Sequence, residues 1–254
     1  MDTRLNALSQ ARVLVVGDLI VDRYWQGETQ RISPEAPVPV VQVNDIEERV
    51  GGAANVAANV VALGADTRLI GVVGADAEAA TLQTLSAALG IHTNFVTAAD
   101  RRTTVKLRVV SQGQQLVRLD FENKESGGHA EAVVTAVKRE LSACEVVVIS
   151  DYNKGAVDRV AAIIALAREA GKIVVVDPKG NDFSPYAGAT VLTPNLKEFE
   201  AVVGPCVGLD DVVAKAQRLL SELDLGALLV TRGAAGMSLI ERDGRHTHLP
   251  AQAQ

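Results

Sequence analysis

The 254-residue sequence predicts an α/β fold with a mostly parallel central sheet flanked by helices and a small β excursion. Short runs of Val, Ile and Leu alternate with helical segments, which is the pattern of parallel strands joined by right-handed crossovers. Three of these runs end in aspartate. Two other stretches, residues 23–48 and 101–122, break the rhythm with prolines or with alternating apolar and polar residues.

The composition is typical of one large globular domain, with 48% hydrophobic and 22% charged residues and a net charge of −6. This balance offers no broad basic surface to nucleic acid or to a membrane. No apolar run is long enough to cross a bilayer, and we find no signal peptide before Gly17. Cys144 and Cys206 have no metal-ligand spacing, so we expect reduced thiols in a cytoplasmic protein.

The first strand is predicted by an apolar run at residues 13–16 that leads into Asp18. Because ligands of open α/β sheets bind at the carboxyl ends of strands, Asp18 could accept hydrogen bonds from sugar hydroxyls. A turn aspartate is the alternative. Two later apolar runs end in the same way, at Asp151 and Asp177. Three carboxylates at strand ends are hard to ascribe to turns alone.

Residues 23–48 contain three prolines, which exclude a helix and a central strand, so we expect edge strands here. Gly51-Gly52 then opens a helix rich in alanine, with Asn55 in its first turn. Paired glycines let a ligand approach the backbone, and a helix start offers free N–H groups to an oxygen-rich ligand. A capped helix with glycine at both ends explains the same pattern.

A strand is next predicted at residues 67–73, and Asp76 begins a helix that ends at Gly90. Residues 101–122 then predict a hairpin with its turn at Gln112-Gly113. Lys106 and Arg108 share one face of it. Such charges usually belong to a solvated face with cross-strand ion pairs. The alternative is a lid over the site, in which Lys106 or Arg108 meets an anionic group.

From residue 128 onwards helices and strands alternate again. Asn195 and Glu198 form the pattern of a capping box at the start of a helix that ends at Gly204. The functional alternative places both side chains beside nucleotide phosphates and their Mg²⁺, and both interpretations can hold together. His246 and His248 share a strand face, but no third metal ligand is evident. The sequence has no G-x-G-x-x-G motif, no Walker A motif and no serine nucleophile elbow.

The glycine-rich stretch resembles the first signature of the ribokinase-like (PfkB) carbohydrate kinase family, through Gly51, Gly52, Asn55, Ala57, Gly64 and Gly74. Four more segments resemble the heptose 7-phosphate kinase domain of bacterial lipopolysaccharide precursor synthesis: 17–25, 31–40, 106–108 and 193–196. The match runs almost end to end. It implies an ATP- and Mg²⁺-dependent transfer of phosphate to the anomeric hydroxyl of D-glycero-β-D-manno-heptose 7-phosphate, on the route to ADP-heptose. It also implies a small β lid, often shared in a homodimer.

The resemblance also implies a set of site residues. Those expected to hold the sugar are Asp18, Gly51, Gly52, Asn55 and Asp151. Charge and placement favour Lys106 and Arg108 for the 7-phosphate. Those expected near ATP are Asn195, Leu196, Lys197, Glu198, Thr231, Arg232 and Gly233, with Glu198 acting on Mg²⁺ indirectly.

One departure from the family concerns its second signature, a Gly-Ala-Gly-Asp-like turn whose N–H groups hold the transferring phosphate and whose Asp takes the proton. No such segment occurs in residues 1–254, so we expect the base beyond Gln254 and assign no catalytic residue within the chain. Loss of the base costs ~10²–10⁴ in rate and loss of one oxyanion donor ~10²–10³. The chain is therefore expected to be an incomplete kinase domain, inactive alone, with part of its sheet exposed and no adenylyltransferase domain.

Two alternatives remain open at this point. One is a non-catalytic protein that binds sugar phosphate or dimerises. The other is a ribokinase-like kinase of another sugar or of a nucleoside.

Overall fold

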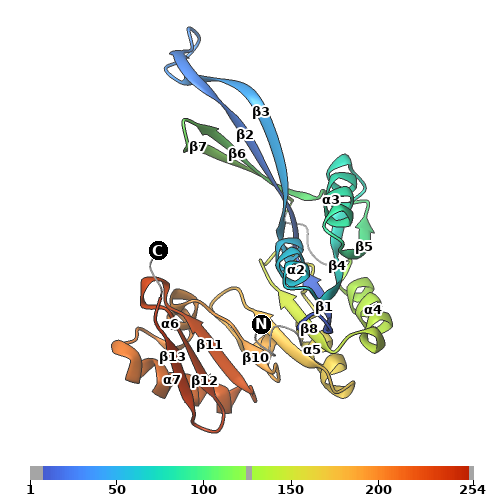
Figure 1. The fold of residues 1–254 in the computed structure, drawn as a ribbon, viewed down its shortest axis with the longest axis vertical. Coiled ribbons are helices and arrows are strands. Elements are labelled where there is room, and N and C mark those ends of the chain that lie inside the picture. Colours follow the sequence, from blue (N-terminus) through green and yellow to red (C-terminus); the bar gives the residue numbers. More distant parts are fainter. Residues whose placement is uncertain (1–7, 124–127, 252–254) are drawn as a thin grey trace.

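The main body of the computed structural model, which describes residues 8–123 and 128–251, is a nine-stranded sheet (Figure 1). Its strand order is β13-β12-β11-β10-β9-β8-β1-β4-β5. The pairs from β5 to β11 are parallel, and β12 and β13 are antiparallel to their neighbours, which confirms the predicted mostly parallel sheet. The strands are β1 (Arg12–Gly17), β4 (Asp66–Gly74), β5 (His92–Ala98), β8 (Val146–Ser150), β9 (Ile173–Asp177), β10 (Val191–Leu192), β11 (Ala227–Thr231), β12 (Met237–Glu241) and β13 (His246–Leu249).

Helices cover the two faces of this sheet unequally. One face packs along its length on α4 (Ala130–Glu140), α5 (Val160–Glu169), α6 (Leu196–Val203) and α7 (Gly208–Glu222), which share one large core cluster with the strands. The other face packs on α2 (Ala53–Ala62) and α3 (Ala77–Ala88), near β1 and β4. The body also contains three short 3₁₀ helices: η1 (Leu141–Ala143), η2 (Ser184–Tyr186) and η3 (Gly233–Ala235).

The second face of the sheet is bare over β9 to β12 in the part of the chain that the structure describes. Most side chains on this face are apolar and are half-buried or exposed, and Ile173 and Met237 are 49% and 38% exposed. Leu229 and Leu239 pair across β11 and β12 on the same face. Exposed apolar surface here agrees with the expectation from the sequence.

A separate four-stranded sheet, in the order β3-β2-β6-β7, projects away from the body (Figure 1). Its strands are β2 (Leu19–Ile32), β3 (Pro39–Gly52), β6 (Thr104–Ser111) and β7 (Gln114–Phe121). The expectation of edge strands in residues 23–48 is wrong for β2, which lies between β3 and β6. β2 can be central because the prolines lie outside it. β7 is also an edge, and both turn residues before it, Gln112 and Gly113, have positive φ.

The sequence interpretation missed two elements, β5 and α7. β5 is an edge strand of mixed polar and apolar residues that carries little hydrophobic periodicity. The small sheet also extends beyond the predicted lid limits, to Leu19 and to Gly52. Among the described helices, none is both long and apolar enough to span a bilayer.

Candidate functional site

A cavity of about 420 Å³ opens at the carboxyl ends of β8 to β11. Parallel strands bring their carboxyl ends to one edge of the sheet, so loops that are distant in the sequence meet there. The residues that line the cavity are Asp151, Tyr152, Asp177, Pro178, Lys179, Thr193, Asn195, Glu198 and Thr231. Four of the residues predicted from the sequence therefore meet at one place: Asp151, Asn195, Glu198 and Thr231.

Three carboxylates and one ammonium group dominate the charge of this cavity. Burial, followed by the charge of Glu198, raises the pKa of Asp177 to about 6. Burial also raises the pKa of Asp151. Lys179 Nζ donates to Glu198 Oε1 at 2.8 Å, and this hydrogen bond raises the pKa of Lys179. The excess of carboxylate oxygens suits a ligand that carries a hard cation.

The capping box is present with both of its hydrogen bonds. The backbone N–H of Glu198 donates to Asn195 Oδ1 at 3.0 Å, and the backbone N–H of Asn195 donates to Glu198 Oε2 at 3.1 Å. Both side chains also line the cavity. Asn195 and Glu198 therefore start α6 and face the cavity at the same time, as the sequence allowed.

The other residues expected near the nucleotide differ in their placement. Leu196 packs on the large core, and Lys197 is exposed. Thr231 lies at the cavity and pairs with Asn195 in an isolated bridge. Arg232 and Gly233 follow it but do not line the cavity. Within the described residues, the buried Nε of Arg232 has no hydrogen-bond partner.

Asp18 is 0% exposed, and its carboxylate faces the protein chain. Its two oxygens accept the backbone N–H groups of Tyr152, Lys154 and Ala156 at 2.8 to 3.0 Å. These hydrogen bonds fasten the loop after β8 to the end of β1. Direct contact between Asp18 and a sugar would require that loop to open, so its role in sugar binding stays a prediction.

The two glycines at the end of β3 are needed for close contacts within the chain. A Cβ at Gly51 would stand 2.3 Å from Asp22 Oδ2, and one at Gly52 would stand 2.3 Å from the carbonyl oxygen of Asp18. Gly52 also has a φ of 57°, which favours glycine. Asn55 is exposed in the first turn of α2. The neighbour of Gly51 in this structure is thus the Asp22 carboxylate.

Two cations of β6, Lys106 and Arg108, have neighbours of different kinds. Arg108 Nη1 donates to Asp22 Oδ1 at 2.6 Å, and its guanidinium carbon lies 5.2 Å from the centre of the Tyr24 ring. Lys106 Nζ lies 5.7 Å from the ring centre of Tyr152, which lines the cavity. No carboxylate of the described residues lies within 4.0 Å of that ammonium group. Lys106 is therefore the more available cation of the two.

Four residues at or near the site have no role that the sequence predicts: Asp22, Tyr152, Lys179 and Tyr186. The available signal for Asp22 is its place as the first charged residue of β2, directly after three buried apolar residues. The others required the tertiary structure, because their partners come from distant segments.

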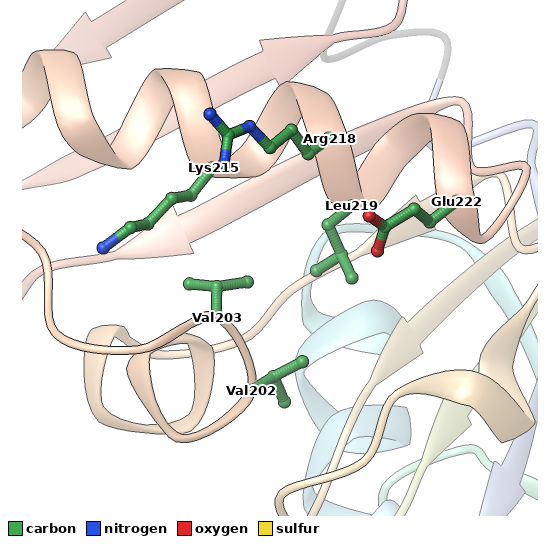
Figure 2. A pocket seen from close by; sticks show the side chains of 6 residues that line it. All are labelled: Val202, Val203, Lys215, Arg218, Leu219 and Glu222. Atoms are coloured by element: carbon green, nitrogen blue, oxygen red, sulfur yellow. The ribbon is translucent and has the colours of Figure 1, made fainter.

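A second hollow lies between α6 and α7, and Figure 2 shows the side chains that line it: Val202, Val203, Lys215, Arg218, Leu219 and Glu222. Lys215 Nζ is already engaged with Asp211 Oδ2 at 3.0 Å and with the carbonyl oxygen of Pro205 at 2.5 Å. None of the predicted site residues lines this hollow.

The described residues contain no preformed metal site. No three His, Cys, Asp or Glu groups there are arranged to hold a metal ion. His248 Nδ1 lies 3.0 Å from Ser238 Oγ, within the sheet.

Comparison with known proteins points to one family. The model of the pfkB family of carbohydrate kinases matches residues 10–254. The chain is 51% identical over 254 residues to the bifunctional protein HldE of Aliivibrio fischeri and 52% identical over 253 residues to that of Shewanella loihica. It is covered completely in both cases and spans 53% of each relative, about half of their length.

Solved structures share the fold at low sequence identity. Phosphofructokinase-2 from Escherichia coli in complex with fructose-6-phosphate matches with a TM-score of 0.73 and 21% identity, over 96% of this chain and 82% of that one. Arabidopsis thaliana ribokinase complexed with ribose and ATP matches with a TM-score of 0.69 and 17% identity, over 95% of this chain and 78% of that one.

Proposed function

Because the chain belongs to the pfkB family of carbohydrate kinases, we propose that it is the sugar- and nucleotide-binding part of a heptose 7-phosphate kinase. The complete domain would transfer the γ-phosphate of ATP to O1 of D-glycero-β-D-manno-heptose 7-phosphate. The identity of about half of all residues to bifunctional HldE proteins supports this substrate. The observation that supports the proposal is the cavity, where Asp151, expected on the sugar side, lies beside Asn195, Glu198 and Thr231, expected on the nucleotide side.

The proposed nucleotide side is the edge made by Lys179, Asn195, Glu198 and Thr231. Lys179 holds a positive charge that can move from Glu198 to a phosphate oxygen. Mg²⁺ would neutralise charge on the phosphates and help to orient them. Carboxylate oxygens are ligands that this ion prefers, and Glu198 would act on it indirectly, through water, while the phosphates bind it directly.

The proposed sugar side lies between the cavity and the small sheet, which acts as a lid. Asp151 offers carboxylate oxygens to hydroxyl groups at the cavity edge. Lys106 and Arg108 extend from β6 with Asp22 beside them, and Lys106 is the first choice for the 7-phosphate. Asp18 would act through the loop that it fastens.

The chemical step needs a group that takes the proton of the attacking hydroxyl. We propose that residues 1–254 bind both ligands without turning them over at a useful rate, because they lack the Gly-Ala-Gly-Asp-like turn. Phosphoryl transfer depends on positioning and on charge stabilisation, so loss of base and anion cradle is severe.

We also propose that the lid forms a homodimer contact. Every residue of β7 is exposed, and this edge strand carries apolar side chains at Leu116, Val117, Leu119 and Phe121. Edge strands with exposed apolar residues favour pairing with a second chain. A Leu119→Glu variant that sediments as the same species as the wild type would contradict this contact.

The test of the proposed function measures ADP release with Mg-ATP and heptose 7-phosphate, for residues 1–254 beside a longer chain that contains the missing turn. Activity in the longer chain alone is expected. Turnover by residues 1–254 would refute the argument about the missing base. Ligand-dependent thermal shifts without ADP release from either chain would favour a non-catalytic binder. Faster ADP release with fructose phosphates, ribose or adenosine than with heptose 7-phosphate would show that the proposed substrate is wrong.

A further inference from the structure

Tyr186 lies at a junction between the two proposed halves of the site. It ends η2, is 3% exposed, and its ring packs edge-on against Phe183 with the ring centres 6.1 Å apart. Its hydroxyl donates to Asp151 Oδ2 at 2.8 Å and accepts the backbone N–H of Lys179 at 3.2 Å. One buried hydroxyl thus bonds the loop after β8 and the loop after β9.

Hydrogen bonds continue from this hydroxyl in both directions. On one side, Asp151 Oδ1 accepts the backbone N–H of Asn153 at 2.7 Å, within the loop that Asp18 fastens. On the other side, Lys179 pairs with Glu198, which closes the capping box of α6. These hydrogen bonds link the sugar side of the cavity to its nucleotide side through Lys179, whose backbone N–H bonds the hydroxyl and whose side-chain Nζ bonds Glu198.

The hydroxyl is suited to this position because it stays protonated. Burial raises the pKa of Tyr186, so the group remains a hydrogen-bond donor at any working pH. A hydrogen bond to a charged acceptor contributes more than a neutral one, and a buried carboxylate that loses its donor is costly. Packing of the ring does not supply these bonds, since phenylalanine would pack in the same way.

We propose that Tyr186 is a positioning residue whose hydroxyl couples the sugar side of the site to its nucleotide side. The inference rests on the proposed function and deepens it. A sugar that binds Asp151 fixes the carboxylate, the carboxylate fixes the hydroxyl, and the hydroxyl fixes the loop that carries Lys179. Binding of one ligand thereby prepares the site for the other.

The first experiment needs no ligand. Amide hydrogen exchange of Lys179 is compared in the wild type and in Tyr186→Phe, because that N–H donates to the hydroxyl. We expect faster exchange in Tyr186→Phe. Ser184→Ala is the matched control, since it removes a hydroxyl of the same 3₁₀ helix whose partner, Asp182, does not line the cavity. Unchanged amide exchange at Lys179 would contradict the claim that the Tyr186 hydroxyl holds the loop after β9.

The second experiment uses calorimetry to measure the affinity of the protein for the Mg²⁺ complex of a non-hydrolysable ATP analogue. The measurement is made with and without heptose 7-phosphate. In the wild type we expect the sugar phosphate to raise nucleotide affinity about fivefold or more, which is the usual size of coupling between sites. In Tyr186→Phe, the ratio of the nucleotide affinities with and without the sugar phosphate should fall below about twofold. Ser184→Ala should keep the wild-type ratio.

The outcomes separate the inference from the proposed function. An absent coupling in the wild type, or an unchanged coupling in Tyr186→Phe, overturns the inference. Equal loss of both affinities with the coupling intact shows a merely structural tyrosine and also overturns it. If neither ligand binds to the wild type, the proposed function itself fails, and the exchange experiment still tests the junction.

Discussion

At the scale of single residues, the cavity keeps Asp151, Asp177 and Glu198 together with one compensating lysine. Burial and the neighbouring carboxylates work against ionisation of Asp177 and raise its pKa from 3.8 to about 6. The folded state therefore binds this proton more tightly than the unfolded state. The stability that Asp177 contributes through this tighter proton binding is fully present below about pH 4 and is lost as the pH rises to about 6.

Asp177→Asn should accordingly stabilise the protein at pH 7, by on the order of 1 kcal/mol once solvent screening is allowed for. Urea unfolding at pH 4 and pH 7 measures the effect, which should be small at the lower pH. Asp182→Asn is the control, because hydrogen bonds from Ser184 lower the pKa of Asp182 and its replacement should not stabilise. A destabilised Asp177→Asn at pH 7 would contradict this account.

Lys106 gives a second prediction at this scale. Lys106→Ala should weaken binding of heptose 7-phosphate more than binding of the dephosphorylated heptose, because the ammonium group has no carboxylate partner among the described residues. Arg108→Ala should also weaken binding of heptose 7-phosphate more than binding of the dephosphorylated heptose. The difference should be smaller than for Lys106→Ala, because the Arg108 guanidinium is held by Asp22. Calorimetry with both sugars decides the point.

Arg118→Ala is the matched control for these variants. Arg118 lies on the neighbouring strand of the same sheet and is paired with Asp120 at 2.8 Å. We expect it to leave the ratio of the two affinities unchanged. Equal losses for both sugars in Lys106→Ala would remove the residue from the phosphate role.

At the scale of elements, the start of α6 serves the fold and faces the cavity. Asn195→Ala should cost about 1 kcal/mol, the usual loss for a helix cap. Asn195→Ser keeps a capping oxygen and removes only the amide, so it separates the two roles. Lower ATP affinity in Asn195→Ser at unchanged stability supports the nucleotide role. If Asn195→Ala loses stability but keeps its ATP affinity, Asn195 serves only as part of the capping box.

Elements with a strong local pattern could be predicted from the sequence. The parallel strands, the hairpin at Gln112-Gly113 and the capping box of α6 are set by nearby residues, and the structure confirms them. β5 was missed because an edge strand is only half-buried and shows weak periodicity. The prolines in residues 23–48 predict edge strands for the whole stretch, but they lie outside β2, which is a central strand of the small sheet.

The site was only partly predictable, for a physical reason. Asp151, Asn195 and Glu198 follow strands, so the rule that parallel strand ends converge was enough to bring them together. The partners of Asp22 and Tyr186 are Arg108 and Asp151, which lie 86 and 35 residues away in the sequence. No local pattern encodes such pairs, and only the folded chain reveals them.

At the scale of the whole molecule, helices cover one face of the sheet more fully than the other in the part of the chain that the structure describes. Leu228 and Leu229 are neighbours on β11 that point to opposite faces, and Leu228 is 0% exposed whereas Leu229 is half-buried. The chain spans 53% of the matched HldE proteins and about four-fifths of the matched solved structures. We propose that further residues of a longer chain pack on the bare face over β9 to β12.

This proposal predicts that the cost of one substitution depends on chain length. Leu228→Ala should cost about 2–5 kcal/mol in residues 1–254 and in a longer chain, because it opens a cavity in the same core. Leu229→Ala should cost less than about 1 kcal/mol in residues 1–254, where little apolar area is lost, and about 2 kcal/mol or more in the longer chain. Urea unfolding of the four variants measures both differences. If Leu229→Ala has the same small cost in the longer chain, the added residues pack elsewhere, and the bare face is a surface of the complete protein.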